Sequence, residues 1–177
     1  ARWGMHITYQ HEDQLLGTAG SAKRAEPFLQ GDDPVLIHYW DVVTDQDLGA
    51  VLAAHQAHQA ALTLLLHERA DSNSMVALAP DLRVRELLER PDEAARARLD
   101  SKWVNSGVYL MEPRLLENLS TSTPLDFPRD VFPSLLESER VFGYPLTGYR
   151  SAIDSPERLE RARQDIRDLG WIPWGEA

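Results

Sequence analysis

A run of small residues near the beginning of the chain has the composition of a ligand-binding turn. Gly17, Thr18, Ala19 and Gly20 open a segment that we expect to be helical to about Leu29. Small side chains let a backbone approach a flat base or a phosphate closely, and the first N–H groups of a helix attract anions. The alternative is a loop whose glycines serve only its turn.

Asp41 follows the apolar run Pro34–Tyr39. Such a run is typical of a strand buried on both faces, and open α/β sheets bind ligands beyond the carboxyl ends of their strands. A carboxylate at that position is well placed to hold a divalent cation between phosphates. The alternative is a turn aspartate. Asp45 and Asp47 are better explained as acids at a helix start.

Two further segments carry groups that suit a sugar phosphate. The Glu89 carboxylate can accept hydrogen bonds from sugar hydroxyls, and the neighbouring Arg90 can hold a phosphate. Asn105 interrupts an apolar strand pattern, where its amide can bridge two hydroxyls, and Gly107 allows close approach. The plainer interpretations are an exposed charge pair ended by a proline, and a strand bulge.

Two other arrangements favour no chemistry. His55 and His58 lie three residues apart on a predicted helix, but no third metal ligand accompanies them. A solvated helix face explains them better. The chain has no nucleophile-elbow motif with an ordered Ser, His and Asp, so the sequence does not favour a hydrolase.

The elements that must position these residues alternate between strands and helices. The apolar runs Val35–Tyr39 and Ala61–Leu66 flank a helix that we expect to begin with Thr44 as N-cap. This order is the unit of a doubly wound α/β fold, so we predict a mostly parallel central sheet flanked by helices, with the two runs as adjacent strands. The apolar face of the helix is expected to consist of Leu48, Val51 and Leu52.

More elements are predicted on both sides of this unit. Ser155 caps a last helix with Pro156 at its first position, where proline is favoured. We expect Leu159, Ala162, Ile166 and Leu169 to form the apolar stripe of that helix. The other expected elements are strands at Met5–Tyr9, Trp103–Met111 and Val141–Leu146, a hairpin-like pair at Met75–Leu78 and Val84–Leu88, helices at Pro113–Leu119 and Asp130–Leu136, and a packed tail at Trp171–Trp174.

The composition is that of an ordinary globular protein. The 177 residues are 43% hydrophobic and 26% charged, which fits one domain over residues 1–177. A net charge of −10 argues against nucleic acid or an anionic membrane as a partner. The absence of cysteine excludes disulfides and thiolate metal sites and fits a cytoplasmic protein. No apolar run is long enough to span a membrane, and the first residues do not form a signal peptide.

In their order along the chain, these segments resemble the sugar-1-phosphate nucleotidyltransferases, also called NDP-sugar pyrophosphorylases. The resemblance extends from about Met5 to Ile166. The matching segments are the turn Gly17–Gly20, the strand and helix of Val35–Leu48 with the metal-binding Asp between them, Glu89-Arg90-Pro91 for the family's Glu-Lys-Pro, Asn105–Tyr109 for its Asn-Ala-Gly-Ile-Tyr, and the later landmarks Phe127–Leu136 and Ile153–Glu157.

The resemblance implies a reaction and a site. A sugar 1-phosphate attacks the α-phosphorus of an NTP, giving NDP-sugar and pyrophosphate, and the protein supplies positioning and charge. The base, the sugar and a possible homo-oligomer stay open. The implied roles are nucleotide binding for Gly17, Thr18, Ala19 and Gly20, catalytic Mg²⁺ binding for Asp41 and Asp154, and sugar-phosphate binding for Glu89, Arg90, Asn105 and Gly107.

The sequence departs from the family's pattern at several positions. The Gly-rich first loop, with its Arg and later Lys, is missing, so we expect an N-terminally incomplete domain with slow or no turnover. Trp40 replaces the Gly before the Asp. Arg90 replaces a Lys, which keeps the positive charge but changes the geometry of the charged group. Ala152 stands where the second metal-binding Asp is expected, and Asp154 lies two residues on, along the same strand face.

These departures keep two other possibilities open. One is a non-catalytic relative that binds a nucleotide or a protein partner. The other is a longer protein whose N-terminal part lies outside this sequence.

Overall fold

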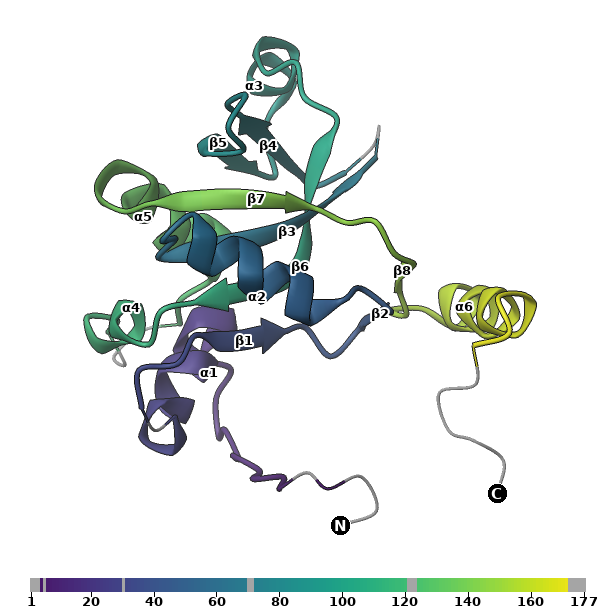
Figure 1. Cartoon of the computed structure of the whole chain (residues 1–177), viewed down its shortest axis with the longest axis horizontal. Helices are drawn as coiled ribbons and strands as arrows, with labels where there is room; N and C mark the ends of the chain where they lie inside the picture. Colours follow the sequence, from purple (N-terminus) through teal and green to yellow (C-terminus); the bar gives the residue numbers. More distant parts are fainter. Residues whose placement is uncertain (1–3, 5, 30, 70–71, 121–123, 172–177) are drawn as a thin grey trace.

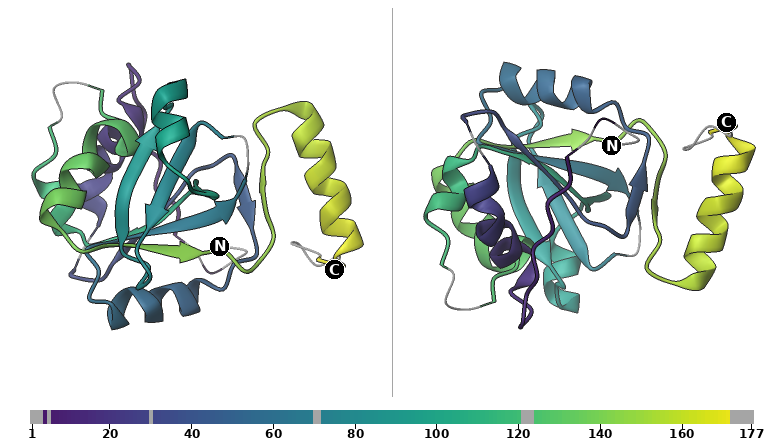
Figure 2. Two further views of the ribbon diagram at one scale, coloured as in Figure 1. Left: turned by 90° about the horizontal axis from the view of Figure 1, so that it is seen from above. Right: turned by 90° about the horizontal axis from the view of Figure 1, so that it is seen from below.

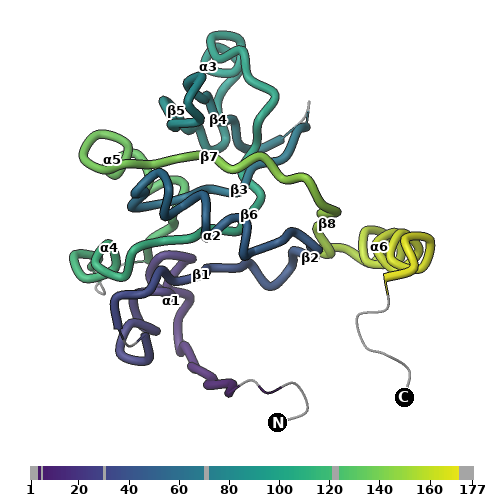
Figure 3. Tube along the Cα trace, viewed as in Figure 1, coloured from purple at the N-terminus to yellow at the C-terminus, as the bar shows by residue number. Residues whose placement is uncertain are grey.

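The computed structural model describes residues 4, 6–29, 31–69, 72–120 and 124–171 (Figures 1 and 3). Its strands are β1 Val35–His38, β2 Val42–Thr44, β3 Leu62–Glu68, β4 Ser74–Leu78, β5 Val84–Glu89, β6 Trp103–Met111, β7 Val141–Pro145 and β8 Arg150–Ala152. Its α-helices are α1 Gly17–Ala25, α2 Leu48–Ala57, α3 Glu93–Arg98, α4 Arg114–Glu117, α5 Phe132–Ser138 and α6 Pro156–Asp168. A 3₁₀ turn, η1 Glu26–Phe28, follows α1, and a π-helix, η2 Phe127–Val131, precedes α5.

Six of the described strands form one mixed sheet, in the order β5-β4-β6-β3-β7 with β1 also paired to β6. β3 and β7 are parallel, whereas β6 is antiparallel to β1, β3 and β4, and β4 is antiparallel to β5. Hence β1, β3, β4 and β7 run in one direction, and β5 and β6 run in the other. The predicted class is confirmed: strands that mostly share one direction form a central sheet flanked by helices (Figure 2).

The prediction that β1 and β3 are adjacent is wrong. β6 lies between them, because Ile37 of β1 and Leu64 of β3 both face Tyr109 of β6, from opposite edges. Helix α2 does connect β1 to β3 through the short strand β2, but the connection passes over one strand position. Apolar periodicity reports that a strand is buried and does not report which strand is its neighbour.

Other local expectations also need correction. Asp47, not Thr44, is the N-cap of α2, and its carboxylate accepts a hydrogen bond from the Ala50 N–H at 3.1 Å. In the predicted apolar face of α2 only Val51 is buried, while Leu48 and Leu52 are more than one third exposed. His55, which was expected on a solvated helix face, is buried.

The first predicted strand is also absent from the described residues 6–9, which form no regular structure. Ile7 is 60% exposed and Tyr9 is 87% exposed, so these side chains have no surface on which a strand would pack. Met5 and the tail residues 172–174 lie outside the described residues.

Most other elements are found where they were predicted. β4 and β5 form the expected antiparallel pair, β6 and β7 coincide closely with the predicted strands, and α4, η2 and α5 lie within or close to the predicted helical segments. Helix α6 begins with Ser155 as N-cap, whose hydroxyl accepts a hydrogen bond from the Arg158 N–H at 3.2 Å. Of its predicted apolar stripe, Ala162 is buried, whereas Leu169 is 59% exposed.

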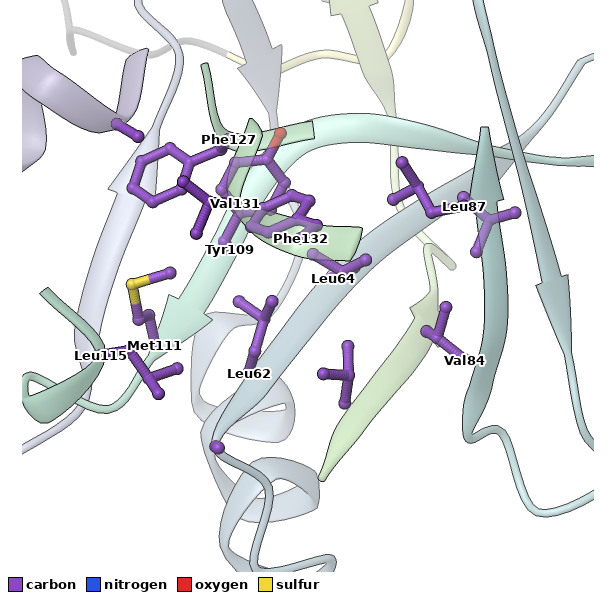
Figure 4. Close-up of a cluster of buried hydrophobic side chains, with 14 of the residues drawn as sticks. Leu62, Leu64, Val84, Leu87, Tyr109, Met111, Leu115, Phe127, Val131 and Phe132 are labelled. Atoms are coloured by element: carbon purple, nitrogen blue, oxygen red, sulfur yellow. The ribbon is translucent and has the colours of Figure 1, made fainter. Parts of the chain in front are cut away.

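The core lies on both faces of the sheet because side chains alternate along β3 and β6. Leu62, Leu64 and Tyr109 join the larger cluster, with Phe127 and Phe132 from the η2–α5 segment (Figure 4). The opposite face carries a smaller cluster beneath α2, made of Val42, Val51, Leu65, Val108 and Leu110. Helix α6 stands apart from the sheet at the end of β8 (Figures 1 and 2).

Candidate functional site

A pocket of about 220 Å³ opens on one edge of β6, between two of its partner strands. β1 pairs with residues 108–111 of β6, and β4 pairs with β6 again at Trp103. The residues between these two ladders therefore have no described strand beside them on that edge. We call this hollow the candidate pocket, and its lining consists of Tyr39, Asp41, Val42, Ser72, Asn73, Ser74, Glu89, Asn105, Ser106, Gly107, Asp126, Pro128 and Arg150.

Four of the predicted site residues meet in the candidate pocket. Asp41 comes from the loop after β1, Glu89 is the last residue of β5, and Asn105 and Gly107 belong to β6. These residues are far apart in the sequence, so the fold collects them. Gly17 and Asp154, which were also predicted as site residues, do not line this pocket.

Gly107 and Asn105 shape the floor of the candidate pocket. Gly107 has a φ of +79° within an irregular part of the β3–β6 ladder, and a Cβ there would lie 3.0 Å from the Tyr39 ring. The Asn105 side chain accepts a hydrogen bond from the Gly107 N–H at 3.0 Å and donates one to the Tyr109 hydroxyl at 2.7 Å. The Asn105 amide thus stabilises the bulge that leaves room beside β6.

Glu89 lies half-buried in the candidate pocket. Burial raises the pKa of its carboxyl, and the nearby Asp126 adds to the increase, while Arg90 opposes it. Arg90 itself is not in the lining: its side chain is 82% exposed and its guanidinium lies 4.0 Å from the Glu89 carboxylate. The structure therefore separates the two neighbours, with the Glu89 carboxylate in the pocket and the Arg90 guanidinium outside it.

The run Gly17–Gly20 contributes one residue to a second, more apolar pocket of about 580 Å³, and Gly17, Ala19 and Gly20 are not in its lining. The N–H groups of Ala19 and Gly20 both donate to the Leu125 carbonyl, at 2.9 and 3.3 Å, so helix α1 docks on that segment. Thr18 lines the second pocket, and its hydroxyl donates to the Asp126 carboxylate at 3.0 Å. The roles predicted for these residues in nucleotide binding stay predictions.

The second pocket adjoins the candidate pocket, since Tyr39 and Asp41 line both. Trp40 also lines the second pocket, with its side chain 85% exposed. It therefore does not fill the candidate pocket.

Asp154 is a neighbour of Asp41 in the backbone but not in the candidate pocket. The Ile153 N–H donates to the Asp41 carbonyl at 2.7 Å, and Ala152 lies opposite Val42 in the β2–β8 pair. Both carboxylate oxygens of Asp154 instead lie 2.9 Å from the Arg158 guanidinium. Only Asp41 of these two acids lines the candidate pocket.

Asp41 suits a single carboxylate ligand for Mg²⁺. Within the described residues its carboxylate has no hydrogen bond or ion pair, and no group of three or more His, Cys, Asp or Glu side chains could hold a metal. Mg²⁺ is commonly held by one or two carboxylates together with substrate phosphates and water. A metal at Asp41 would therefore need ligands from the substrate.

Tyr39, Asp126 and Arg150 are among the lining residues that the sequence did not indicate. The Tyr39 hydroxyl is buried with no hydrogen-bond partner in the described structure, and burial raises the pKa of this phenol. Asp126 and Arg150 supply opposite charges to the lining. Arg150 stands two residues before Ala152, a position already singled out, but nothing in the sequence pattern showed that Tyr39 or Asp126 faces a pocket.

Comparisons with known proteins identify the class that this fold and pocket define. The family model described as "Nucleotidyl transferase" matches residues 1–171, so the chain belongs to that family. The chain is 28% identical over 156 residues to the mannose-1-phosphate guanyltransferase of Pichia angusta and 24% identical over 156 residues to that of Saccharomyces cerevisiae. Each alignment covers 88% of this chain, and the chain spans only 42% and 43% of those two relatives.

Solved structures show the same fold. A putative glucose-1-phosphate thymidylyltransferase from Bacillus anthracis matches 98% of this chain and 69% of its own, with a TM-score of 0.79 at 19% identity. A UDP-glucose pyrophosphorylase matches 92% of this chain and 66% of its own, with a TM-score of 0.73 at 15% identity. The resemblance drawn from the sequence motifs is confirmed. No described helix has the length and apolarity needed to cross a bilayer.

Proposed function

We propose that the candidate pocket takes part in transferring a nucleotidyl group from an NTP to a sugar 1-phosphate, giving NDP-sugar and pyrophosphate. The observation that carries this proposal is the meeting of Asp41, Glu89, Asn105 and Gly107 in one hollow of a nucleotidyl transferase fold. Because several relatives are named mannose-1-phosphate guanyltransferases, GTP and mannose 1-phosphate are the first substrates to test.

In this proposal the sugar phosphate lies against Glu89, Asn105 and Gly107. The Glu89 carboxylate accepts hydrogen bonds from sugar hydroxyls, which offsets the cost of its partial burial. The Tyr39 side chain lines the same wall beside Gly107. Gly107 has no side chain, so a ring can approach the strand closely.

The nucleotide and the metal belong on the Asp41 side. Asp41 is the proposed protein ligand of Mg²⁺, which would screen the phosphate charges when bound. Thr18 lines the adjoining apolar pocket, which is the proposed place for the base, and Gly17, Ala19 and Gly20 form the turn and helix start that carry it. Asp154 would reach the metal only by leaving Arg158.

A second candidate function is binding without catalysis, and one observation favours it. Asp154 is paired with Arg158, and the lining of the candidate pocket contains no lysine among the described residues. With one free carboxylate and few cations, a pocket can bind a nucleotide sugar without activating the α-phosphorus.

The test is product formation by the 177-residue chain with GTP, mannose 1-phosphate and Mg²⁺, followed by other NTPs and sugar 1-phosphates. We expect slow formation of NDP-sugar, well below about one turnover per second, and its loss in Asp41→Ala. Asp32→Ala, an exposed acid outside both pockets, is the matched control. NDP-sugar binding without product formation would favour the second function. The absence of both NDP-sugar binding and product formation would contradict the proposal.

A further inference from the structure

Two pockets beside the candidate pocket are lined by arginines. One, of about 370 Å³, is lined by Arg69, Ser72, Asn73, Arg96 and Arg158. The other, of about 360 Å³, is lined by His67, Arg69, Arg150, Ser151, Ala152, Arg158 and Arg161. Because Arg69 and Arg158 line both, we treat them as one region, the arginine pockets.

The charge of the arginine pockets is opposite to that of the molecule. The chain has 18 Lys and Arg against 28 Asp and Glu, yet five arginines line these two hollows. No described Asp or Glu belongs to either lining. Like charges gathered without acids repel one another, so this region attracts an anion.

Few of these guanidinium groups are neutralised within the described structure. Arg158 pairs with Asp154 at 2.9 Å, and Arg96 donates to the Ser72 carbonyl at 2.7 Å. The side chains of Arg69 and Arg161 have no hydrogen bond or ion pair to any described residue. Their donors are available to a ligand.

Two buried nitrogen atoms in the same wall also lack partners. The Nε of Arg150 and the Nδ1 of His67 are buried and form no hydrogen bond in the described structure. Burial, with the charges of Arg150 and Arg69, lowers the pKa of His67 to about 4, so its ring is neutral at pH 7. Burial also lowers the pKa of the Arg150 guanidinium, and the negative charge of a nearby anion would offset the cost of burying this cation.

The arginine pockets connect with the candidate pocket. Arg150 lines the candidate pocket and one arginine pocket, and Ser72 and Asn73 line the candidate pocket and the other. The backbone also holds Arg150 there, because its guanidinium donates to the Ser106 carbonyl at 3.0 Å. A ligand in the candidate pocket can therefore extend toward the arginines.

We propose that the arginine pockets bind an oligophosphate chain, such as pyrophosphate or the phosphate tail of a nucleotide, directly through guanidinium groups. This inference rests on the proposed function for the origin of the oligophosphate, but binding itself does not require turnover. The planar guanidinium group binds phosphate oxygens in a bidentate manner, and several of them together neutralise a polyanion. Binding should therefore persist without Mg²⁺.

Calorimetric titration of the 177-residue chain with sodium pyrophosphate in EDTA tests this proposal. We expect saturable binding, and a loss of at least about tenfold in affinity for the double variant Arg69→Ala/Arg161→Ala, since charge-assisted hydrogen bonds to both residues are removed. Arg163→Ala is the matched control, because this exposed residue of α6 pairs with Glu160 and lines neither hollow. Circular dichroism establishes that all variants are folded.

Three results would overturn the proposal. They are no pyrophosphate binding in EDTA, an equal loss in Arg163→Ala, and equal affinity for inorganic phosphate, which reaches fewer arginines. The assay contains neither sugar nor nucleotide. Pyrophosphate binding in a chain that binds no NDP-sugar would therefore support the arginine pockets while contradicting the proposed function.

Discussion

At the scale of single residues, the candidate pocket gains its character from groups that the fold leaves in unusual surroundings. Glu89 is a half-buried acid beside Asp126, and Tyr39 has a buried hydroxyl without a partner in the described structure. The sequence pointed to Glu89 because it adjoins a strand end and a proline. It could not point to Tyr39, because the place of this ring beside Gly107 depends on a contact between segments far apart in the sequence.

The raised pKa of Glu89 leads to a pH-dependent prediction. Since burial raises the folded-state pKa, the folded protein prefers the protonated acid, and stability falls as the pH rises from the ordinary Glu value of about 4.3 through the raised value. Glu89→Gln should therefore be more stable than the wild type at pH 7, and this difference should vanish below about pH 4. Chemical denaturation across pH measures it. A gain that is unchanged at low pH, or one equally present in the exposed Glu137→Gln, would count against this account.

At the scale of elements, the sequence predicted where strands and helices lie along the chain better than it predicted which strands lie side by side. β6 was predicted with its observed bounds, but its place between β1 and β3 was not. The position of β6 decides the site, because the candidate pocket is the gap along β6 between β1 and β4. The order of the strands along the chain does not predict that β6 lies between β1 and β3, since all three strands have a similar apolar pattern.

Helix α1 offers a test of element docking. Gly17 has a φ of +75°, and a Cβ there would lie 2.3 Å from the Leu125 carbonyl oxygen. Gly31 has a φ of +92°, and a Cβ there would meet nothing within 4 Å, so this position separates backbone strain from steric overlap. Gly31→Ala should cost about 1 kcal/mol of unfolding free energy, and Gly17→Ala at least about 1 kcal/mol more. Equal losses in denaturant melts would show that α1 is not packed on Leu125 as described.

At the scale of the whole molecule, charge is divided unevenly. The chain carries a net charge of −10, while five arginines gather around the pockets beside β6 and β8. The net charge argued against nucleic acid or an anionic membrane as a partner, and it did not reveal this local concentration. The concentration arises because the segment after β3, helix α3, β8 and α6 all contribute arginines to these hollows. The comparisons place the chain in the nucleotidyl transferase family, over a span of about 42% of the curated relative from Pichia angusta.

The most direct test of the central claim is the affinity of the 177-residue chain for intact sugar nucleotides, measured by calorimetry with GDP-mannose and then with UDP-glucose. We predict saturable binding of at least one of them, weakened by about tenfold or more in Glu89→Ala and unchanged in Glu137→Ala. Glu137 is an exposed acid that lines neither the candidate pocket nor the arginine pockets. If no sugar nucleotide binds, or if binding does not depend on Glu89, the candidate pocket is not the site of this chemistry.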